Sequence, residues 1–228
     1  LMEKELKYLV DTMNNPAHPC AVILGGAKIG DKIELIYNIV EKTDTILIGG
    51  AMAFTFLKVQ GKNVGSSLID EENLEVAESI LRLLEKSNTN LVLPVDVVAS
   101  PELSHDTPCR VAKLEELNDD EAGYDIGPET TMNFELLLSG NKTIVWNGPM
   151  GVFEIPAFST GTQAIASIVR GQTEEGAISI IGGGDTASAL KNYGITDGFT
   201  HISTGGGASL QLMSGKQLPA LETLHEYA

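Results

Sequence analysis

Six short runs of apolar and β-branched residues recur along the chain, and most are nearly continuous in apolar character. Strands buried on both faces have this character, and they occur in parallel sheets covered by helices. The runs span residues 21–24, 45–48, 91–93, 143–146, 177–181 and 199–203. With 228 residues, 43% of them hydrophobic, the chain is long enough to bury the core of one globular domain.

Amphipathic helical patterns lie between these runs. Apolar residues recur at helical spacing over 33–40 (Ile33, Ile36, Tyr37, Val40) and over 74–84. Alternating strands and helices predict an α/β fold with a six-stranded, mainly parallel sheet and helices on both faces. A further stripe at Leu6, Leu9, Val10 and Met13 predicts a helix over residues 1–15 that connects to another domain. Residues 94–116 carry three prolines without helical period, and we expect a surface excursion that contains a hairpin.

Glycine follows five of the six runs within two or three residues. The carboxyl ends of parallel strands share one edge of a sheet, which is where such folds bind ligands. We therefore expect these loops to converge on a binding site. The alternative is that each glycine only ends a strand and starts a turn.

The charge excludes several classes of partner. Fifteen Lys and Arg against 31 Asp and Glu give a net charge of −16, which argues against nucleic acid or an anionic membrane as partner. No run reaches the roughly 18 apolar residues that cross a bilayer, and we expect a cytoplasmic protein. Cys20 and Cys109 form no CxxC, so neither a zinc site nor a disulfide framework is expected.

The loop at 25–32 places Lys28 and Lys32 four residues apart at the start of a helix, where both point the same way. There they would add two charges to the helix N-terminal field around a phosphate. Its glycine spacing resembles a Walker A loop, but Asp31-Lys32 replaces the required Lys-Ser/Thr. The alternative for both lysines is a solvated surface position.

The loop at 182–187 joins a buried strand to a helix and contains Gly183, Gly184, Asp185 and Thr186. Glycine amides approach phosphate oxygens closely, and a carboxylate beside them suits Mg²⁺. Asp185 could instead be a simple helix N-cap. The loop also matches GxGxxA, but the acidic ribose ligand of an NAD-dependent dehydrogenase is missing from the end of the next strand.

Two more loops complete the candidate site. Residues 203–208 (Ser-Thr-Gly-Gly-Gly-Ala) open a helix and offer bare amides to an anion, or alternatively allow close helix packing. Residues 146–154 provide an apolar wall for a base from Pro149, Met150 and Val152, with Glu154 available to ribose hydroxyls. Their alternative is a structural turn with buried aromatics. The four histidines show no Ser-His-Asp or Cys-His arrangement.

In combination and order, these segments resemble the phosphoglycerate kinase family over essentially the whole chain. The matching segments are GGAK with DK at 25–32, GGAMAFTFLK at 49–58, DIGP at 125–128, WNGPMGVFE at 146–154, GGGDT at 182–186 and STGGGAS at 203–209. The resemblance is to the family's C-terminal lobe and implies a three-layer Rossmann-like sandwich that binds Mg-ADP or Mg-ATP. It divides the chain into the interdomain helix at 1–15 and a nucleotide-binding domain at 16–228.

The resemblance also implies residue roles. Lys32, Gly183, Gly184 and Thr186 would contact phosphates, with Asn147 nearby, and Asp185 would hold Mg²⁺. Glu154 would bind ribose, and Gly26 and Ala27 would join the nucleotide contacts. The adenine slot would be formed by Gly49, Gly50, Gly123, Tyr124, Pro149 and Val152. Lys28 and the helix start at Gly205, Gly206 and Gly207 would stabilise the transferring phosphoryl group.

The family's site for 3-phosphoglycerate lies in its N-terminal lobe, for which no segment matches here. We therefore expect a monomeric fragment that binds nucleotide but is nearly inactive alone. Competing hypotheses are a free-standing nucleotide-binding module with a protein partner, and the dehydrogenase. Gln211 stands where the family usually has Glu, and we expect little effect because it lies outside the phosphate loops. A nucleotide-phosphate site built from these loops requires Lys32 and Asp185 on the same side of the molecule.

Overall fold

The computed structural model describes residue 8, residues 11–203 and residues 205–215. Its centre is a six-stranded sheet in the order β3-β2-β1-β7-β8-β9, and all five neighbouring pairs are parallel. The strands are β1 Cys20–Leu24, β2 Thr45–Ile48, β3 Asn90–Val92, β7 Thr143–Asn147, β8 Ile178–Gly182 and β9 His201–Ile202. Each lies on one of the six predicted runs, so the predicted α/β fold is confirmed.

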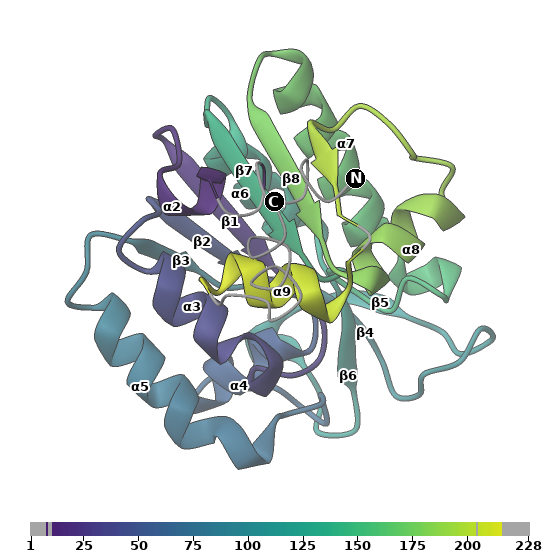
Figure 1. The fold of residues 1–228 in the computed structure, drawn as a ribbon. Coiled ribbons are helices and arrows are strands. Elements are labelled where there is room, and N and C mark those ends of the chain that lie inside the picture. The colour runs from purple at the N-terminus through teal and green to yellow at the C-terminus, as the bar shows by residue number, and fades with distance from the viewer. Residues whose placement is uncertain (1–7, 9–10, 204, 216–228) are drawn as a thin grey trace.

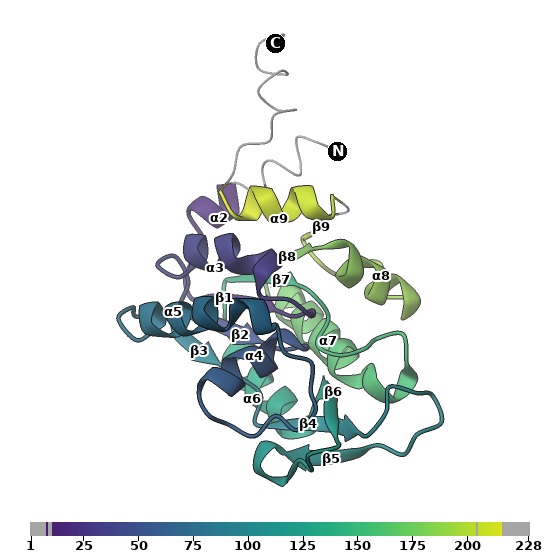
Figure 2. The ribbon, with the colours of Figure 1, turned by 90° about the horizontal axis from the view of Figure 1, so that it is seen from below.

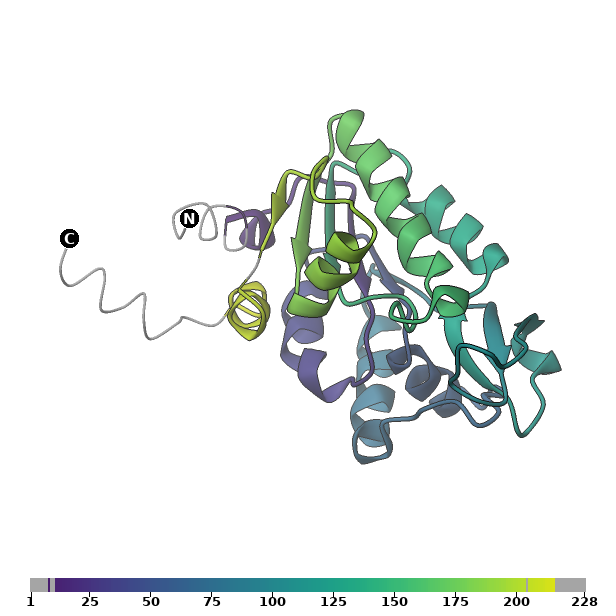
Figure 3. The ribbon, with the colours of Figure 1, turned by 90° about the vertical axis from the view of Figure 1, so that its right-hand side faces the viewer.

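Helices cover both faces of this sheet, which gives the three layers seen edge-on in Figure 3. On one face pack α3 Ile33–Ile39, α4 Met52–Val59, α5 Leu74–Leu84 and α9 Gly207–Met213, and on the other α6 Pro128–Leu138, α7 Thr160–Glu174 and α8 Gly184–Asn192. The side chains of β1 alternate between the two cores: Val22 and Leu24 join the first, and Ala21 and Ile23 join the second. Every residue of β1 is buried, which explains why its sequence shows no polar alternation.

A second, three-stranded antiparallel sheet in the order β5-β4-β6 packs beside the first, below it in Figure 1. It consists of β4 Asp96–Ser100, β5 Arg110–Lys113 and β6 Ala122–Ile126. The β4–β5 pair confirms the expected hairpin within residues 94–116. The third strand, β6, was not expected. The core of this sheet includes Phe54 and Leu57 of α4, which anchor it to the larger layer.

Four 3₁₀ turns complete the described elements: η2 Gly30–Lys32, η3 Glu71–Asn73, η4 Leu114–Glu116 and η5 Pro156–Phe158. Near the start, α2 Thr12–Asn14 buries Met13, whereas Leu6, Leu9 and Val10 of the expected N-terminal helix lie outside the described residues. Figure 2 and Figure 3 show α2 and α9 on the same side of the large sheet. None of the described helices is long and apolar enough to cross a membrane.

One expected core position is wrong. Tyr37 belongs to the predicted stripe of α3 but is 46% exposed. The buried face of α3 is instead formed by Leu35, Ile36 and Ile39. The helix therefore turns its apolar face slightly away from the expected direction, and Tyr37 lies at the boundary with solvent.

Candidate functional site

A cleft of about 670 Å³ lies at the carboxyl edge of the large sheet, where strand exits meet the starts of α3, α8 and α9. Its wall comes from loops after β1, β7 and β8 and from α9, so segments far apart in the sequence converge as expected. The predicted site residues that line it are Gly26, Ala27, Lys28, Lys32, Asn147, Pro149, Gly183, Gly184, Asp185, Thr186, Gly206 and Gly207. These residues share one cleft, which satisfies the requirement that Lys32 and Asp185 lie on the same side.

The strand exits are tied together by backbone hydrogen bonds. The amide of Gly26 donates to the Pro149 carbonyl at 2.9 Å, and that of Gly50 donates to the Met150 carbonyl at 3.0 Å. Gly50 has a φ of +65°, and a Cβ there would lie 2.5 Å from the Gly26 nitrogen. At this position the structural explanation for glycine holds, because the chain segments approach too closely for a side chain.

The glycines around α8 and α9 differ from Gly50. A Cβ added at Gly184, Gly206 or Gly207 would meet no heavy atom within 4 Å. These residues face the open space of the cleft, so packing does not require glycine at any of them, and only Gly206, with a φ of +52°, has a backbone conformation that favours it. Bare backbone amides at a helix start are well suited to a phosphate or another anion.

The two lysines have different environments. Lys32 ends η2 directly before α3 and is 9% exposed, whereas Lys28 is exposed in the preceding loop. Burial lowers the pKa of Lys32, and the negative charges of Asp31 and Asp185 oppose that shift. The surface-lysine alternative is therefore wrong for Lys32. Its ammonium group is a partly desolvated cation, which strengthens its attraction to an anion in the cleft.

The α8 start holds Asp185 and Thr186 in distinct ways. Thr186 is fully buried, and its Oγ1 accepts from the Gly148 amide at 2.8 Å and donates to the Gly182 carbonyl at 3.0 Å. It thereby joins the β8–α8 loop to the loop after β7. Asp185 is exposed in the first helical turn, and the N-cap is Gly183, with no side-chain cap bond. The interpretation of Asp185 as a plain N-cap is therefore wrong.

The cleft fits a Mg²⁺ ion that is bound by one protein carboxylate and mainly by the phosphate oxygens of a bound molecule. Asp185 supplies one carboxylate directly at the α8 amides. Within the described parts of the chain, no three His, Cys, Asp or Glu side chains gather to form an all-protein metal site. One or two carboxylates plus phosphate oxygens are the usual ligands of Mg²⁺. The residues present therefore fit a magnesium ion that arrives with a phosphate-bearing ligand.

Seven predicted site residues do not line this cleft: Gly49, Gly50, Gly123, Tyr124, Val152, Glu154 and Gly205. Three of them, Gly50, Gly123 and Tyr124, line a small separate cavity between the two sheets. The Val152 amide donates to the Tyr124 carbonyl at 2.9 Å, which joins the loop after β7 to β6. Glu154 lies near Tyr193, whose pKa is raised by burial and further by the charges of Asp125 and Glu154.

Sequence reasoning missed part of the cleft. Asp31, Glu34, Gly148, Leu210, Gln211 and Ser214 also line it. Gln211, expected to lie apart from the phosphate loops, is brought to the cleft by α9. The Asn38 side chain donates to the Met213 carbonyl at 2.8 Å and helps hold α9 against α3. The helical spacing of Leu210, Gln211 and Ser214 is the signal that could have placed them on one face.

Comparison with known proteins gives one consistent result. The sequence profile of the family described as phosphoglycerate kinase matches residues 1–216. The phosphoglycerate kinase of Finegoldia magna is 49% identical over 227 residues, which cover 99% of this chain and 56% of that protein. The one from Chloroherpeton thalassium is 47% identical over 224 residues, covering 98% of this chain and 56% of its own length.

Solved structures agree. Phosphoglycerate kinase from Coxiella burnetii superposes with a TM-score of 0.93 at 42% identity, covering 98% of this chain and 57% of the other. The enzyme from Pyrococcus horikoshii gives a TM-score of 0.85 at 32% identity, covering 99% and 56%. The chain thus spans little more than half the length of the relatives it matches. Its sequence, its fold and the matching structures lead to one statement: the chain belongs to the phosphoglycerate kinase family.

Proposed function

We propose that this chain is the C-terminal, nucleotide-binding lobe of a phosphoglycerate kinase. That enzyme transfers a phosphoryl group between 1,3-bisphosphoglycerate and ADP, giving 3-phosphoglycerate and ATP in glycolysis. The observation that carries the proposal is the cleft in which Lys32 and Asp185 meet the open glycine amides at the start of α8. A buried cation, a carboxylate and bare amides together match the charges of a metal-bound polyphosphate.

Residues at the start of α8, together with Lys32, would bind the phosphates. The backbone amides of Gly183, Gly184 and Thr186 would hydrogen-bond phosphate oxygens, with Asn147 alongside. Lys32 would neutralise phosphate charge, which its burial makes more effective. Gly26 and Ala27 line the same wall and would contact the nucleotide through backbone atoms.

Asp185 would hold Mg²⁺, the ion that accompanies ADP or ATP. Bound there, the ion would neutralise charge on phosphate oxygens. The carboxylate projects from the first turn of α8 into the cleft, so it approaches such an ion without breaking any structural bond of its own among those described.

The nucleoside would lie beyond the phosphates, toward the three-stranded sheet. Gly49, Gly50, Gly123 and Tyr124 would form one side of the adenine slot, and Pro149 and Val152 the other. Glu154 would bind ribose hydroxyls. The hydrogen bond between Val152 and Tyr124 supports this assignment because it holds the two sides together.

Phosphoryl transfer needs positioning and charge neutralisation more than a protein nucleophile. Lys28 and the amides of Gly205, Gly206 and Gly207 would stabilise the equatorial oxygens of the group in transit. 3-Phosphoglycerate, the product in this direction and the acceptor in the reverse one, would be held by an N-terminal lobe. Residues 1–15 would connect that lobe to the nucleotide domain at 16–228. We therefore propose that this lobe alone is monomeric, cytoplasmic, competent to bind nucleotide and nearly inactive.

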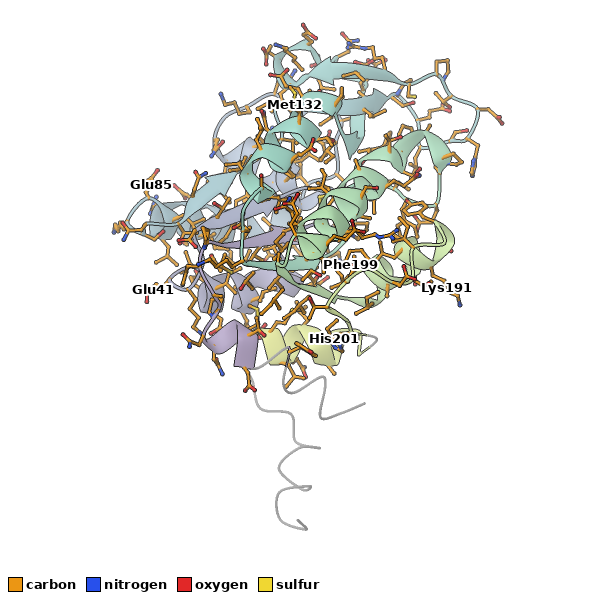
Figure 4. The ribbon with its side chains drawn as sticks, turned by 90° about the horizontal axis from the view of Figure 1, so that it is seen from above. Glu41, Glu85, Met132, Lys191, Phe199 and His201 are labelled. Atoms are coloured by element: carbon orange, nitrogen blue, oxygen red, sulfur yellow. The ribbon has the colours of Figure 1, made fainter. Side chains whose placement is uncertain are left out.

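Calorimetric titration of the folded chain with Mg-ADP tests the binding role. We expect saturable heat below millimolar nucleotide, and a strong loss with Lys32→Ala. The control is Lys191→Ala, because Lys191 lies at the opposite end of α8, as Figure 4 shows. Folded protein that gives no heat at millimolar Mg-ADP would refute the proposal.

Complementation tests the lobe role separately. A separately produced N-terminal part of the Finegoldia magna relative, mixed with this chain, is expected to raise phosphoryl transfer above that of either piece. A free-standing module would bind Mg-ADP equally well, but its activity would not respond to the added lobe. This assay therefore distinguishes the two hypotheses even when both bind nucleotide.

A further inference from the structure

We propose that Asp125 is a positioning residue that sets the spacing between the two sides of the proposed adenine slot. This inference rests on the proposed nucleotide-binding function and adds a residue to which that function assigns no role. Asp125 lies in β6, at the junction of the small sheet, the loop after β7 and the start of α7.

The Asp125 carboxylate makes one hydrogen bond that crosses this junction and one within its own strand. One oxygen accepts from the Gly161 amide at 2.7 Å, in the first turn of α7, and the other accepts from its neighbour Ile126 at 2.9 Å. The residue is 3% exposed. Because Gly161 belongs to α7 and Asp125 to β6, the first bond connects the small sheet to a helix that packs on the large one.

The surroundings leave space for this carboxylate and little else. A Cβ at Gly151 or at Gly161 would lie 2.3 Å from Asp125 Oδ1. A side chain at either position would occupy the space of the carboxylate, so both residues must be glycine for Asp125 to fit. Such close approach from two different segments fixes the oxygen atoms in place.

Asp125 joins β6 to α7 by a hydrogen bond and to the loop after β7 by its close approach to Gly151, and β6 and that loop carry the adenine slot. Gly123 and Tyr124 precede Asp125 directly in β6, and Pro149 and Val152 flank Gly151 in the loop after β7. The bond from the Val152 amide to the Tyr124 carbonyl is the parallel connection, at 2.9 Å. A change in the Asp125 contacts would alter the distance between these walls, whereas the phosphate-binding start of α8 would keep its own bonds through Thr186.

The charge environment contains no compensating cation. Burial raises the pKa of Asp125 to about 7, while the bonds from Gly161 and Ile126 act against that shift. No ion pair involving Asp125 occurs among the described residues. The titratable group near it is Tyr193 at the end of α8. A group with no cation partner and two exact backbone donors is placed for geometry rather than for charge neutralisation.

The test compares a ligand that has a base with one that lacks it. Asp125→Asn keeps the size of the side chain but presents an NH₂ group to one of the two amide donors, so one bond is lost. We expect the Kd for Mg-ADP to rise roughly fivefold to tenfold, the change that one lost hydrogen bond produces. The Kd for Mg-pyrophosphate should stay within about twofold of wild type.

The matched control is Asp96→Asn. Asp96 is also 3% exposed and also accepts from a helix start, at Glu129 and Thr130 of α6, but it does not line the cavity at Gly123 and Tyr124. It should lower stability without a base-selective loss. Should Asp125→Asn not fold, Asp125→Ser, whose hydroxyl can accept one bond, replaces it with the same expectation.

The outcomes separate the two proposals. Equal loss of Mg-ADP and Mg-pyrophosphate, or no loss of either, would overturn the positioning role while leaving nucleotide binding intact. Wild-type protein that binds neither ligand would instead refute the proposed function itself. An equal base-selective loss in Asp96→Asn would also overturn the inference, because it would show a general effect of lost stability.

Discussion

Lys32 and Asp185 line the same cleft; burial lowers the pKa of Lys32, and the charges of Asp31 and Asp185 oppose that shift. The two residues stand at the starts of different helices, α8 and α3, and are brought together only by the parallel sheet beneath them. Lys32 therefore interacts with the Asp185 carboxylate before any ligand is present. A phosphate with Mg²⁺ would satisfy both at once, which makes the pair a sensitive point for mutation.

Asp185→Ala should weaken Mg-ADP by roughly tenfold to hundredfold, the usual range for a lost charged contact. Metal-free ADP should be affected much less, because removal of a carboxylate also removes repulsion of the phosphates. Titrations with and without Mg²⁺ check this. Glu85→Ala, an exposed carboxylate after α5 seen far from α8 in Figure 4, is the control. Equal losses with and without the metal would exclude Asp185 as its ligand.

Lys32→Met should stabilise the ligand-free protein while weakening Mg-ADP. The folded state lowers the pKa of Lys32, so it binds the proton less tightly than the unfolded chain does. Stability should therefore rise as the pH increases from the lowered pKa toward the ordinary lysine value, and this rise should be absent in the variant. At neutral pH the gain is about 1 kcal/mol. Urea unfolding between pH 7 and pH 10 measures it.

A destabilised Lys32→Met variant would mean that the ammonium group is well solvated or well paired in the free protein. Lys28→Met is the comparison, because Lys28 lines the same cleft but is exposed. It should leave the free energy of unfolding nearly unchanged.

The sequence predicted the large sheet well because burial on both faces leaves a direct signal. All five residues of β1 are buried and all five are apolar, as is typical of a strand covered on both faces. The strand β6 was missed because Ala-Gly-Tyr-Asp-Ile combines a glycine and a buried aspartate, both rare in strands. Asp125 is tolerated there only through contacts with α7, which lies far along the chain.

The gathering of Lys32 and Asp185 in one cleft could be predicted for a related reason. Lys32 and Asp185 are near strand exits, and parallel topology alone places strand exits together. The arrival of Gln211 at the cleft could not be predicted in this way, because it depends on how α9 packs against α3. Likewise, local sequence does not distinguish a glycine required by close packing, such as Gly50, from one that faces open space, such as Gly184.

Alanine at those two glycines should therefore give opposite results. Gly50→Ala places a Cβ 2.5 Å from the Gly26 nitrogen at a φ of +65°, and should cost roughly 2 to 4 kcal/mol of stability. Gly184→Ala meets nothing within 4 Å and lies in the first turn of a helix, so it should leave stability unchanged or slightly higher.

The effect of Gly184→Ala should appear in binding instead. Its methyl group enters the cleft where a phosphate oxygen would approach the backbone amide, so Mg-ADP should bind more weakly. Thermal unfolding and calorimetric titration of both variants check the pair. A Gly184→Ala protein that is stable and binds Mg-ADP as wild type does would show that phosphates do not approach this amide.

Asp125 should make stability fall as the pH rises from about 4 to about 7. Its folded pKa, about 7, lies above the ordinary aspartate value because of burial. The stabilising contribution of the bound proton is therefore complete below the unfolded pKa and is lost as the pH rises through the folded one. The loss is on the order of a few kcal/mol.

In Asp125→Asn this part of the profile should disappear, because the amide does not titrate. Chemical unfolding of both proteins at pH 5, 6, 7 and 8 measures the difference, and Asp96→Asn serves as the matched control because Asp96 is equally buried. Parallel profiles for wild type and Asp125→Asn would mean that Asp125 is ionised throughout, and that the bonds from Gly161 and Ile126 outweigh its burial.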